Sequence, residues 1–204
     1  MTGIRLLVAI VSLVALAIGA WLAFSITTRP ALPVSATVLP APVELPPFEL
    51  VDQAGERFTR ADFEGHWNLV FFGFTHCPDV CPLTLKVLAS ARAELAAAGV
   101  SPLPRIVFVS VDPARDKPEL VRDYVAHFDA TAIGLTGTEV DVRELTDGLG
   151  IFFNRAPGTG TNYLVDHSAA VLVIGPDARF RAVFGGPHEV GRYVADLPRI
   201  MGNS

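Results

Sequence analysis

The sequence predicts an α/β fold, with a sheet covered by helices on both faces, preceded by one apolar helix. Through the middle of the chain, apolar runs of strand length alternate with helical segments. The chain then closes with two strands, joined by a turn, and a final helix. In addition, the first 28 residues carry one charged side chain, that of Arg5.

The N-terminal segment is long enough to cross a membrane. From Leu6 to Ile26 there is a run of 21 residues without a charge, which as a helix spans about 30 Å of hydrocarbon. A cleaved signal peptide has a shorter apolar core, of about 7–15 residues, and the weak cleavage site at 34–36 lies late. We therefore expect residues 1–28 to be an uncleaved anchor. A cleaved signal peptide is the alternative.

A proline-rich linker is predicted at residues 29–47. Six prolines lie in this stretch: Pro30, Pro33, Pro40, Pro42, Pro46 and Pro47. Such a composition favours an extended polyproline conformation that acts as a semi-rigid spacer. The folded domain is then predicted at 48–204.

The domain begins with a predicted hairpin. Residues 48–51 and 57–59 have strand character, and the turn sequence Asp52-Gln53-Ala54-Gly55 separates them. Residues 68–74 form an apolar, aromatic run, which is typical of a central strand covered on both faces.

Helices and strands alternate after this strand. Residues 83–98 are rich in Ala, Leu and Lys, and Gly99 follows as a stop signal, so they predict a helix. Residues 105–111 predict a second buried strand. Residues 118–128 predict a helix that has a proline near its start.

The last third of the domain continues this pattern. A strand is predicted at 132–135 and a helix at 138–149. Strands at 169–174 and 180–184 flank the turn Gly175-Pro176-Asp177, and a helix interrupted by Pro198 is predicted at 189–201.

Charge and composition exclude two classes of protein. Hydrophobic residues make up 50% of the chain, which is too apolar for a disordered chain. The formal net charge is -5, and both basic residues of the N-terminal part, Arg5 and Arg29, precede every acidic residue. The remainder is therefore still more acidic and lacks the basic surface that nucleic acid requires.

The two cysteines indicate a functional role rather than a stabilising disulfide bond. Cys77 and Cys81 directly follow the predicted strand at 68–74, at the end of a strand where open α/β sheets place their sites. A bond between them closes a very short loop and adds little stability. Pro82 is well placed to open the next helix, and the positive end of its dipole favours a thiolate at Cys81.

The spacing of the cysteines suits a metal ion. Three intervening residues let both sulfurs face one ion, and thiolates are soft ligands that select Cu(I) or Zn(II). A third ligand must then come from elsewhere in the chain. Two alternatives remain: a purely redox dithiol, and a pair of buried, inert cysteines.

Among five histidines, His167 is the best candidate for this third ligand. It lies just before the predicted strand at 169–174, and in thioredoxin-like folds the loop before this strand packs against the cysteine loop. His76 adjoins Cys77, but its side chain is expected to point away. Structural or surface roles are expected for the other three: His66, His127 and His188.

Three motifs together resemble the Sco/SenC family from about Phe48 to the end of the chain. They are Cys77-Pro78-Asp79-Val80-Cys81-Pro82, Val111-Asp112-Pro113-Ala114-Arg115-Asp116 and Tyr163-Leu164-Val165-Asp166-His167-Ser168. The resemblance implies a thioredoxin-like fold with an N-terminal β-hairpin extension, preceded by one transmembrane helix. It also implies one copper ion, as Cu(I) or Cu(II), bound by Cys77, Cys81 and His167.

Other residues of these motifs are not expected to be ligands. Asp112, Arg115 and Asp116 are interpreted as an ion pair or helix cap near the site. Ala178 is a departure, because the family often has glycine at this position of the turn.

The resemblance implies a copper metallochaperone, not an enzyme, that delivers copper to the dinuclear copper centre of cytochrome c oxidase subunit II. The alternative is a thiol–disulfide reductase that keeps the cysteines of that subunit reduced, with Cys77 and Cys81 as a redox-active disulfide. Expected partners are subunit II, other periplasmic copper chaperones and the membrane, but no nucleic acid. The expected location is the bacterial inner membrane, with the soluble domain in the periplasm.

Overall fold

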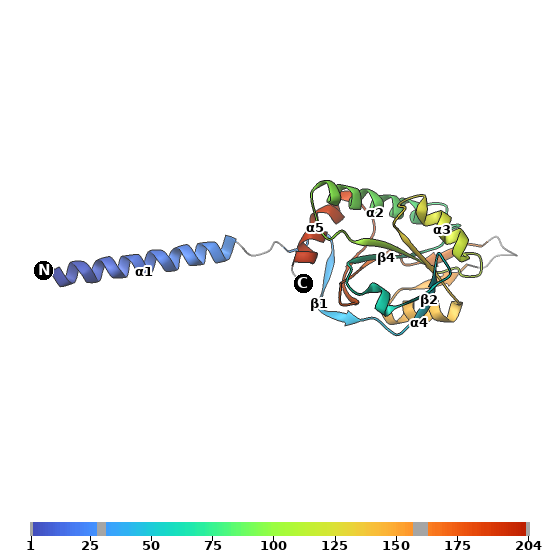
Figure 1. The fold of residues 1–204 in the computed structure, drawn as a ribbon, viewed down its shortest axis with the longest axis horizontal. Coiled ribbons are helices and arrows are strands. Elements are labelled where there is room, and N and C mark those ends of the chain that lie inside the picture. Colours follow the sequence, from blue (N-terminus) through green and yellow to red (C-terminus); the bar gives the residue numbers. More distant parts are fainter. Residues whose placement is uncertain (1, 28–31, 157–162, 203–204) are drawn as a thin grey trace. The chain divides into compact units, whose positions relative to one another are not determined.

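The computed structural model describes residues 2–27, 32–156 and 163–202, in two compact units, 1–32 and 33–204. The first unit contains helix α1 (Thr2–Thr27), shown in blue in Figure 1. Within it, Gly3–Ala23 is long and apolar enough to cross a membrane, with a mean hydropathy of 2.6. An N-terminal signal sequence has the same properties, so the anchor stays a prediction.

The second unit is built on a mixed sheet with the strand order β1-β10-β9-β4-β5-β6-β2-β3. β4, β5 and β6 are parallel, whereas β9 lies antiparallel to β4 on its other side. The strands are β1 (Thr37–Glu44), β2 (Glu49–Asp52), β3 (Arg57–Thr59), β4 (Asn68–Gly73), β5 (Arg105–Ser110), β6 (Ile133–Thr136), β9 (Val171–Ile174) and β10 (Arg179–Phe184).

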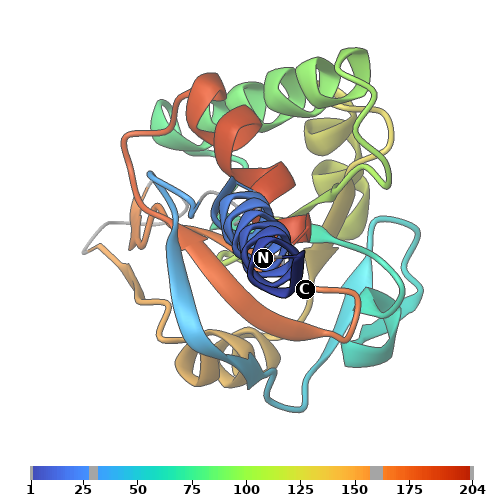
Figure 2. The same cartoon turned by 90° about the vertical axis from the view of Figure 1, so that its left-hand side faces the viewer.

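Helices cover both faces of this sheet, as the sequence predicts. Figures 1 and 2 show α2, α3 and α5 on one face and α4 on the other, and α2 packs against α5. The helices are α2 (Val80–Ala97), α3 (Pro118–Ala126), α4 (Glu139–Leu149), α5 (Val190–Gly202) and the short 3-10 helix η1 (Arg60–Phe63). α5 continues through Pro198, so the predicted interruption is wrong: the proline removes one backbone donor without ending the helix.

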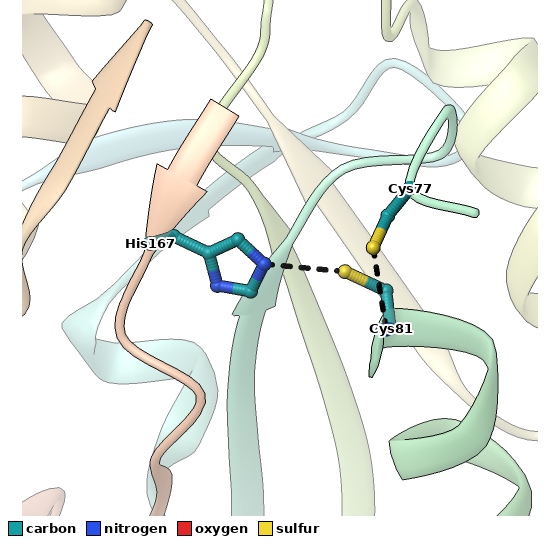
Figure 3. Close-up of side chains that lie close together, drawn as sticks. All are labelled: Cys77, Cys81 and His167. Carbon is teal, nitrogen blue, oxygen red and sulfur yellow. Dashed lines mark hydrogen bonds between the residues drawn. The ribbon is translucent and has the colours of Figure 1, made fainter. Parts of the chain in front are cut away.

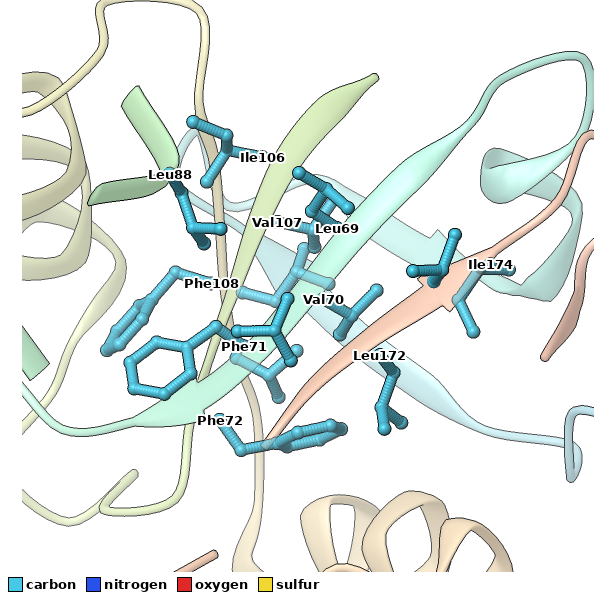
Figure 4. Packing of buried hydrophobic residues seen from close by; sticks show 14 of the residues in the cluster. Leu69, Val70, Phe71, Phe72, Leu88, Ile106, Val107, Phe108, Leu172 and Ile174 are labelled. Atoms are coloured by element: carbon cyan, nitrogen blue, oxygen red, sulfur yellow. The ribbon is translucent and has the colours of Figure 1, made fainter. Parts of the chain in front are cut away.

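The core is centred on β4, where all six residues are buried. Figure 4 shows side chains of β4, β5 and β9 packed together with Leu88 of α2. Phe71 of β4 and Phe108 of β5 are opposite each other in the parallel register, with ring centroids 6.3 Å apart. This packing makes the carboxyl end of β4 a rigid base for the loop that follows.

The structure corrects the predicted linker. Residues 37–44 form an edge strand of the sheet, β1, which pairs with β10 and is irregular between Val38 and Val43. Pro40 and Pro42 lie in that irregular stretch, where a missing N–H removes no ladder hydrogen bond. Part of the expected polyproline spacer therefore belongs to the folded unit.

A buried carboxylate fastens the chain just before β1. Asp196 of α5 is fully buried and accepts hydrogen bonds from the backbone N–H groups of Val34, Ser35 and Ala36, at 2.9, 2.6 and 2.9 Å. Because a carboxylate buried without donors is costly, these contacts tie residues 34–36 to α5.

Two further hairpins complete the domain. The predicted N-terminal hairpin is confirmed as β2 and β3, and it joins the main sheet because β2 pairs with β6. β7 (Phe153–Arg155) and β8 (Val165–His167) form a separate two-stranded sheet that the sequence did not predict.

Ala178 occupies the turn before β10 in a left-handed conformation, with φ of 53°. Left-handed backbone is unfavourable for residues other than glycine. This explains why glycine suits the position and why an alanine there is a departure. The position lies in the hairpin turn, outside the cysteine loop.

Candidate metal centre

The structure brings together the side chains of Cys77, Cys81 and His167, which point toward one another in Figure 3. Their potential ligand atoms all lie within 4.8 Å of one another. Two donors that bind one ion at about 2.3 Å each are at most about 4.6 Å apart. Small side-chain rotations therefore suffice for all three to meet one ion.

The cysteines lie on the turn that joins β4 to α2. The N–H of Cys77 donates to the carbonyl of Phe74 (3.2 Å), which closes a tight turn after the strand. α2 then begins at Val80, so Cys81 lies in its first turn. The N–H of Cys81 donates to Sγ of Cys77 (3.4 Å), and the turn thereby orients one sulfur beside the other.

His167 is the last residue of β8, and its neighbours define its tautomer. Nδ1 lies 3.1 Å from the carbonyl oxygen of Ser168. Because a carbonyl can only accept, Nδ1 carries the proton and Nε2 keeps a lone pair. Nε2 lies 3.3 Å from Sγ of Cys81 and so accepts a hydrogen bond from its thiol.

Aromatic rings hold the imidazole in place. The rings of Phe71 and Phe74 meet it edge to face, with centroids 6.0 and 5.9 Å from that of His167. Both phenylalanines are buried. They limit the rotation of the ring and exclude water from its inner side.

Burial determines the protonation of the site. Burial raises the pKa of the Cys81 thiol and lowers the pKa of His167. This burial opposes the thiolate that the helix N-terminus was expected to favour at Cys81 in the metal-free protein. A metal ion that binds here must release the proton of Cys81.

Gly73 leaves room for the sulfur. A Cβ at this position would lie 2.9 Å from Sγ of Cys81 and 2.9 Å from the ring of Phe108. The last residue of β4 thus has to lack a side chain for Cys81 to occupy its place.

Asp116 fixes the segment that leads to the cysteines. Its fully buried carboxylate accepts from the Thr75 N–H (2.9 Å), the Thr75 hydroxyl (2.6 Å) and the Ser110 hydroxyl (2.6 Å). His76 turns toward this group and away from the sulfurs, with Nδ1 3.0 Å from Oγ1 of Thr75. The sequence interpretation of His76 therefore agrees with the structure.

A second cluster connects the β7–β8 hairpin to the loop after β5. Asp112 is buried, pairs with Arg115 and accepts a hydrogen bond from the Tyr163 hydroxyl (2.7 Å). The guanidinium of Arg115 stacks on the Tyr163 ring at 3.7 Å. The expected ion pair near the site is thus present, and it holds the hairpin that carries His167.

The remaining histidines lie outside the cluster of three. His66 and His127 are exposed. His188 is half-buried and bonded to backbone, unlike the surface turn expected from sequence. Sequence reasoning also missed Ser168, whose main-chain carbonyl orients His167; because every residue carries such a carbonyl, the sequence gives no signal for this contact.

The two sulfurs and one imidazole nitrogen suit a soft metal ion that also accepts nitrogen ligands. Two sulfurs and one imidazole suit copper or zinc and do not suit the hard ions Mg²⁺ and Ca²⁺. Three donors also leave a coordination position for an exogenous ligand. Cys81 is fully buried, Cys77 is 9% exposed and His167 is half-buried, so an exogenous ligand approaches past Cys77 or His167 rather than past Cys81.

Comparisons with known proteins agree with this geometry. The protein family described as SCO1/SenC matches residues 37–202. A relative from Stutzerimonas stutzeri is 36% identical over 194 residues, which cover 94% of this chain and 95% of the relative. The human mitochondrial protein SCO1 homolog is 36% identical over 156 residues, 76% of this chain and 52% of the human protein.

Solved structures give the same result. Arabidopsis thaliana ScoI with copper bound is 32% identical, with a TM-score of 0.74 over 78% of this chain and 99% of the other. Yeast Sco1 with copper bound is 30% identical, with a TM-score of 0.74 over 80% and 91%. These likenesses confirm the predicted thioredoxin-like fold.

Proposed function

The chain belongs to the SCO1/SenC family, and from this premise we propose that it is a copper metallochaperone that holds one copper ion between Cys77, Cys81 and His167. The observation that carries the proposal is the convergence of two sulfurs and one imidazole nitrogen within 4.8 Å. The relatives from Arabidopsis thaliana and yeast, whose structures are described as copper-bound, support the choice of metal.

The site suits both oxidation states of copper. Cu(I) accepts low coordination numbers and soft donors, which the two thiolates provide. Cu(II) prefers more ligands, including nitrogen, so Nε2 of His167 contributes most to that state. The Nδ1–H bond to Ser168 leaves Nε2 free of a proton and ready to bind.

Copper is the cargo of this site, and it leaves through the open coordination position. A thiolate of a recipient protein can enter the open coordination position there, and copper then exchanges its ligands one at a time. We propose the dinuclear copper centre of cytochrome c oxidase subunit II as the recipient. Other periplasmic copper chaperones are the proposed source of the metal.

We also propose the location that this role requires. Residues 1–28 serve as a single anchor in the bacterial inner membrane, and the copper-binding domain lies in the periplasm. The apolar helix α1, which contains a candidate span of 21 residues, supports the anchor.

Transfer between purified proteins tests the proposal. Copper-loaded protein is mixed with the metal-free soluble domain of subunit II, and the absorption spectrum of the dinuclear centre is followed. We expect that spectrum to develop with the wild type and to be absent with Cys77→Ser. If the wild type binds copper but never produces the dinuclear spectrum, the proposed delivery role is wrong.

A second candidate function is thiol–disulfide reduction by Cys77 and Cys81. Cys77 is the more exposed of the two cysteines, and its Sγ lies beside Cys81, whose N–H it accepts, so the two sulfurs are placed for dithiol exchange. This activity does not need His167. A His167→Ala variant that still reduces disulfides in subunit II and still supports oxidase assembly in cells would favour reduction over delivery.

A further inference from the structure

We propose that His188 and Tyr193 are positioning residues that hold the backbone behind His167 and thereby aim its imidazole at the two sulfurs. The inference rests on the proposed function, in which His167 is a copper ligand. Neither residue touches the sulfurs; both act through the peptide groups of Ser168 and Ala169.

A chain of two short hydrogen bonds reaches this backbone. Nε2 of His188 lies 2.6 Å from the carbonyl oxygen of Ala169, so Nε2 carries the proton and donates it. Nδ1 of His188 therefore has a lone pair and accepts from the Tyr193 hydroxyl, 2.6 Å away. One neutral tautomer of His188 satisfies both contacts.

Tyr193 gives this chain a rigid base. It is fully buried on α5, and its ring lies against that of Phe184 on β10, with centroids 4.3 Å apart. α5 packs against α2, whose first turn carries Cys81. The same pair of helices thus supports both the thiol and, through His188, the segment that carries the imidazole.

Ser168 is held from the opposite side. Its N–H donates to the carbonyl of Phe152 (2.9 Å), and its hydroxyl accepts from the N–H of Phe152 (3.1 Å). The carbonyl of Ser168 orients Nδ1 of His167. Along the chain it lies between two fixed points: the hydrogen bonds of Ser168 to Phe152, and the hydrogen bond of the Ala169 carbonyl to His188. With the second fixed point removed, the peptide that joins Ser168 to Ala169 can rotate, and that carbonyl moves with it.

The consequence depends on the oxidation state of copper. Two thiolates alone can retain Cu(I), whereas Cu(II) requires the nitrogen at the correct distance and angle. Loss of His188 is therefore expected to weaken Cu(II) binding and leave Cu(I) binding nearly unchanged.

The test compares four variants of the full chain in detergent. His188→Ala removes the contact, and His188→Gln replaces it with an amide N–H. Tyr193→Phe keeps the ring packing but removes the hydroxyl, and His66→Ala is a control for deletion of an exposed histidine. The measurements are the nitrogen NMR shifts of His167 in the metal-free protein, the Cu(II) spin-resonance spectrum, and Cu(I) and Cu(II) affinities from chelator competition.

We expect His188→Ala to weaken Cu(II) binding about 10-fold, the lower end for groups that support a metal ligand, with Cu(I) binding changed less than threefold. The metal-free His167 should lose its single Nδ1–H tautomer. Tyr193→Phe should have a smaller effect in the same direction, His188→Gln should restore much of the loss, and His66→Ala should resemble the wild type.

Two results would overturn the inference. One is that the His167 tautomer and the Cu(II) spectrum stay unchanged in both His188→Ala and Tyr193→Phe. The other is that these variants weaken the binding of Cu(I) and of Cu(II) equally. Failure of the proposed function looks different, because the wild type itself would then show no sulfur- and nitrogen-ligated Cu(II) spectrum. The NMR measurement on the metal-free protein still decides the positioning role in that case.

Discussion

Substitution of Asp116 should loosen the cysteine loop and weaken copper binding together. The carboxylate is fully buried and accepts three hydrogen bonds, two from Thr75 and one from Ser110. A hydrogen bond to a charged group contributes about 1.5–3 kcal/mol. Water can reach Thr75, which is only half-buried, and recovers part of that loss. We therefore expect Asp116→Ala to lower the free energy of unfolding by about 3–5 kcal/mol.

Asp116→Asn removes the negative charge of the side chain while keeping its size and shape. The amide keeps one acceptor oxygen but turns an NH₂ group toward donors, and the N–H of Thr75 cannot reverse its role. We expect a loss of about 1–3 kcal/mol for this variant. Asp123→Asn on α3 is the matched control, because that side chain is 71% exposed and such changes usually stay within about 0.5 kcal/mol.

Urea unfolding of a protein that begins at Pro33, followed by fluorescence, measures the stability. Copper competition with a chelator measures the site, and we expect an affinity loss of about 10-fold for Asp116→Ala because Thr75 is two residues from Cys77. If Asp116→Ala unfolds within 0.5 kcal/mol of Asp123→Asn (roughly the spread of surface changes), the hydrogen bonds to Thr75 and Ser110 do not have the role described.

Further predictions concern Gly73, Asp196 and the N-terminal helix. Gly73→Ala places a methyl group 2.9 Å from Sγ of Cys81, so it should lower stability by about 1–3 kcal/mol and shift the copper spectrum; an unchanged spectrum would contradict the close approach. Burial raises the pKa of Asp196, but hydrogen bonds from three backbone N–H groups outweigh this and place it below its ordinary value of 3.8. The contribution of Asp196 to stability is therefore present above about pH 4 and lost as the pH falls further. Asp196→Asn should reduce the loss of stability on acidification. An equal dependence on pH in the variant and the wild type would argue against the hydrogen bonds to residues 34–36. Full-length protein should stay in membranes after a carbonate wash, whereas recovery of the natural protein in soluble form, with a new N-terminus near Thr37, would indicate a cleaved signal.

The central part of the fold could be predicted because its strands are continuous apolar runs. β4 and β5 are buried along nearly their whole length, and the sequence at 68–74 and 105–111 contains the corresponding hydrophobic residues. β1 could not be predicted, because Pro40 and Pro42 argue against a strand. They are tolerated because β1 is an edge strand with an irregular register at that point.

The proximity of the three proposed ligands could be predicted from the sequence, whereas their surroundings could not; their role as metal ligands stays a prediction. Cys77, Cys81 and His167 follow from motif and position, and the structure brings them together. The β7–β8 hairpin that presents His167 was missed because its strands have three residues each and carry little periodicity. The contact of His188 with Ala169 joins residues 19 apart through a loop, and no local pattern signals it.

Copper titration of the reduced protein decides whether Cys77, Cys81 and His167 bind copper together. Wild type, His167→Ala and His76→Ala are loaded with Cu(II), and absorption and spin resonance report the bound state. We expect one copper per chain for the wild type and His76→Ala, with a sulfur-to-copper charge-transfer band and nitrogen coupling. His167→Ala should lose the nitrogen coupling and lose or strongly shift the band, while Cu(I) binding persists. A native Cu(II) spectrum in His167→Ala would show that His167 is not the third ligand and would contradict the proposed site.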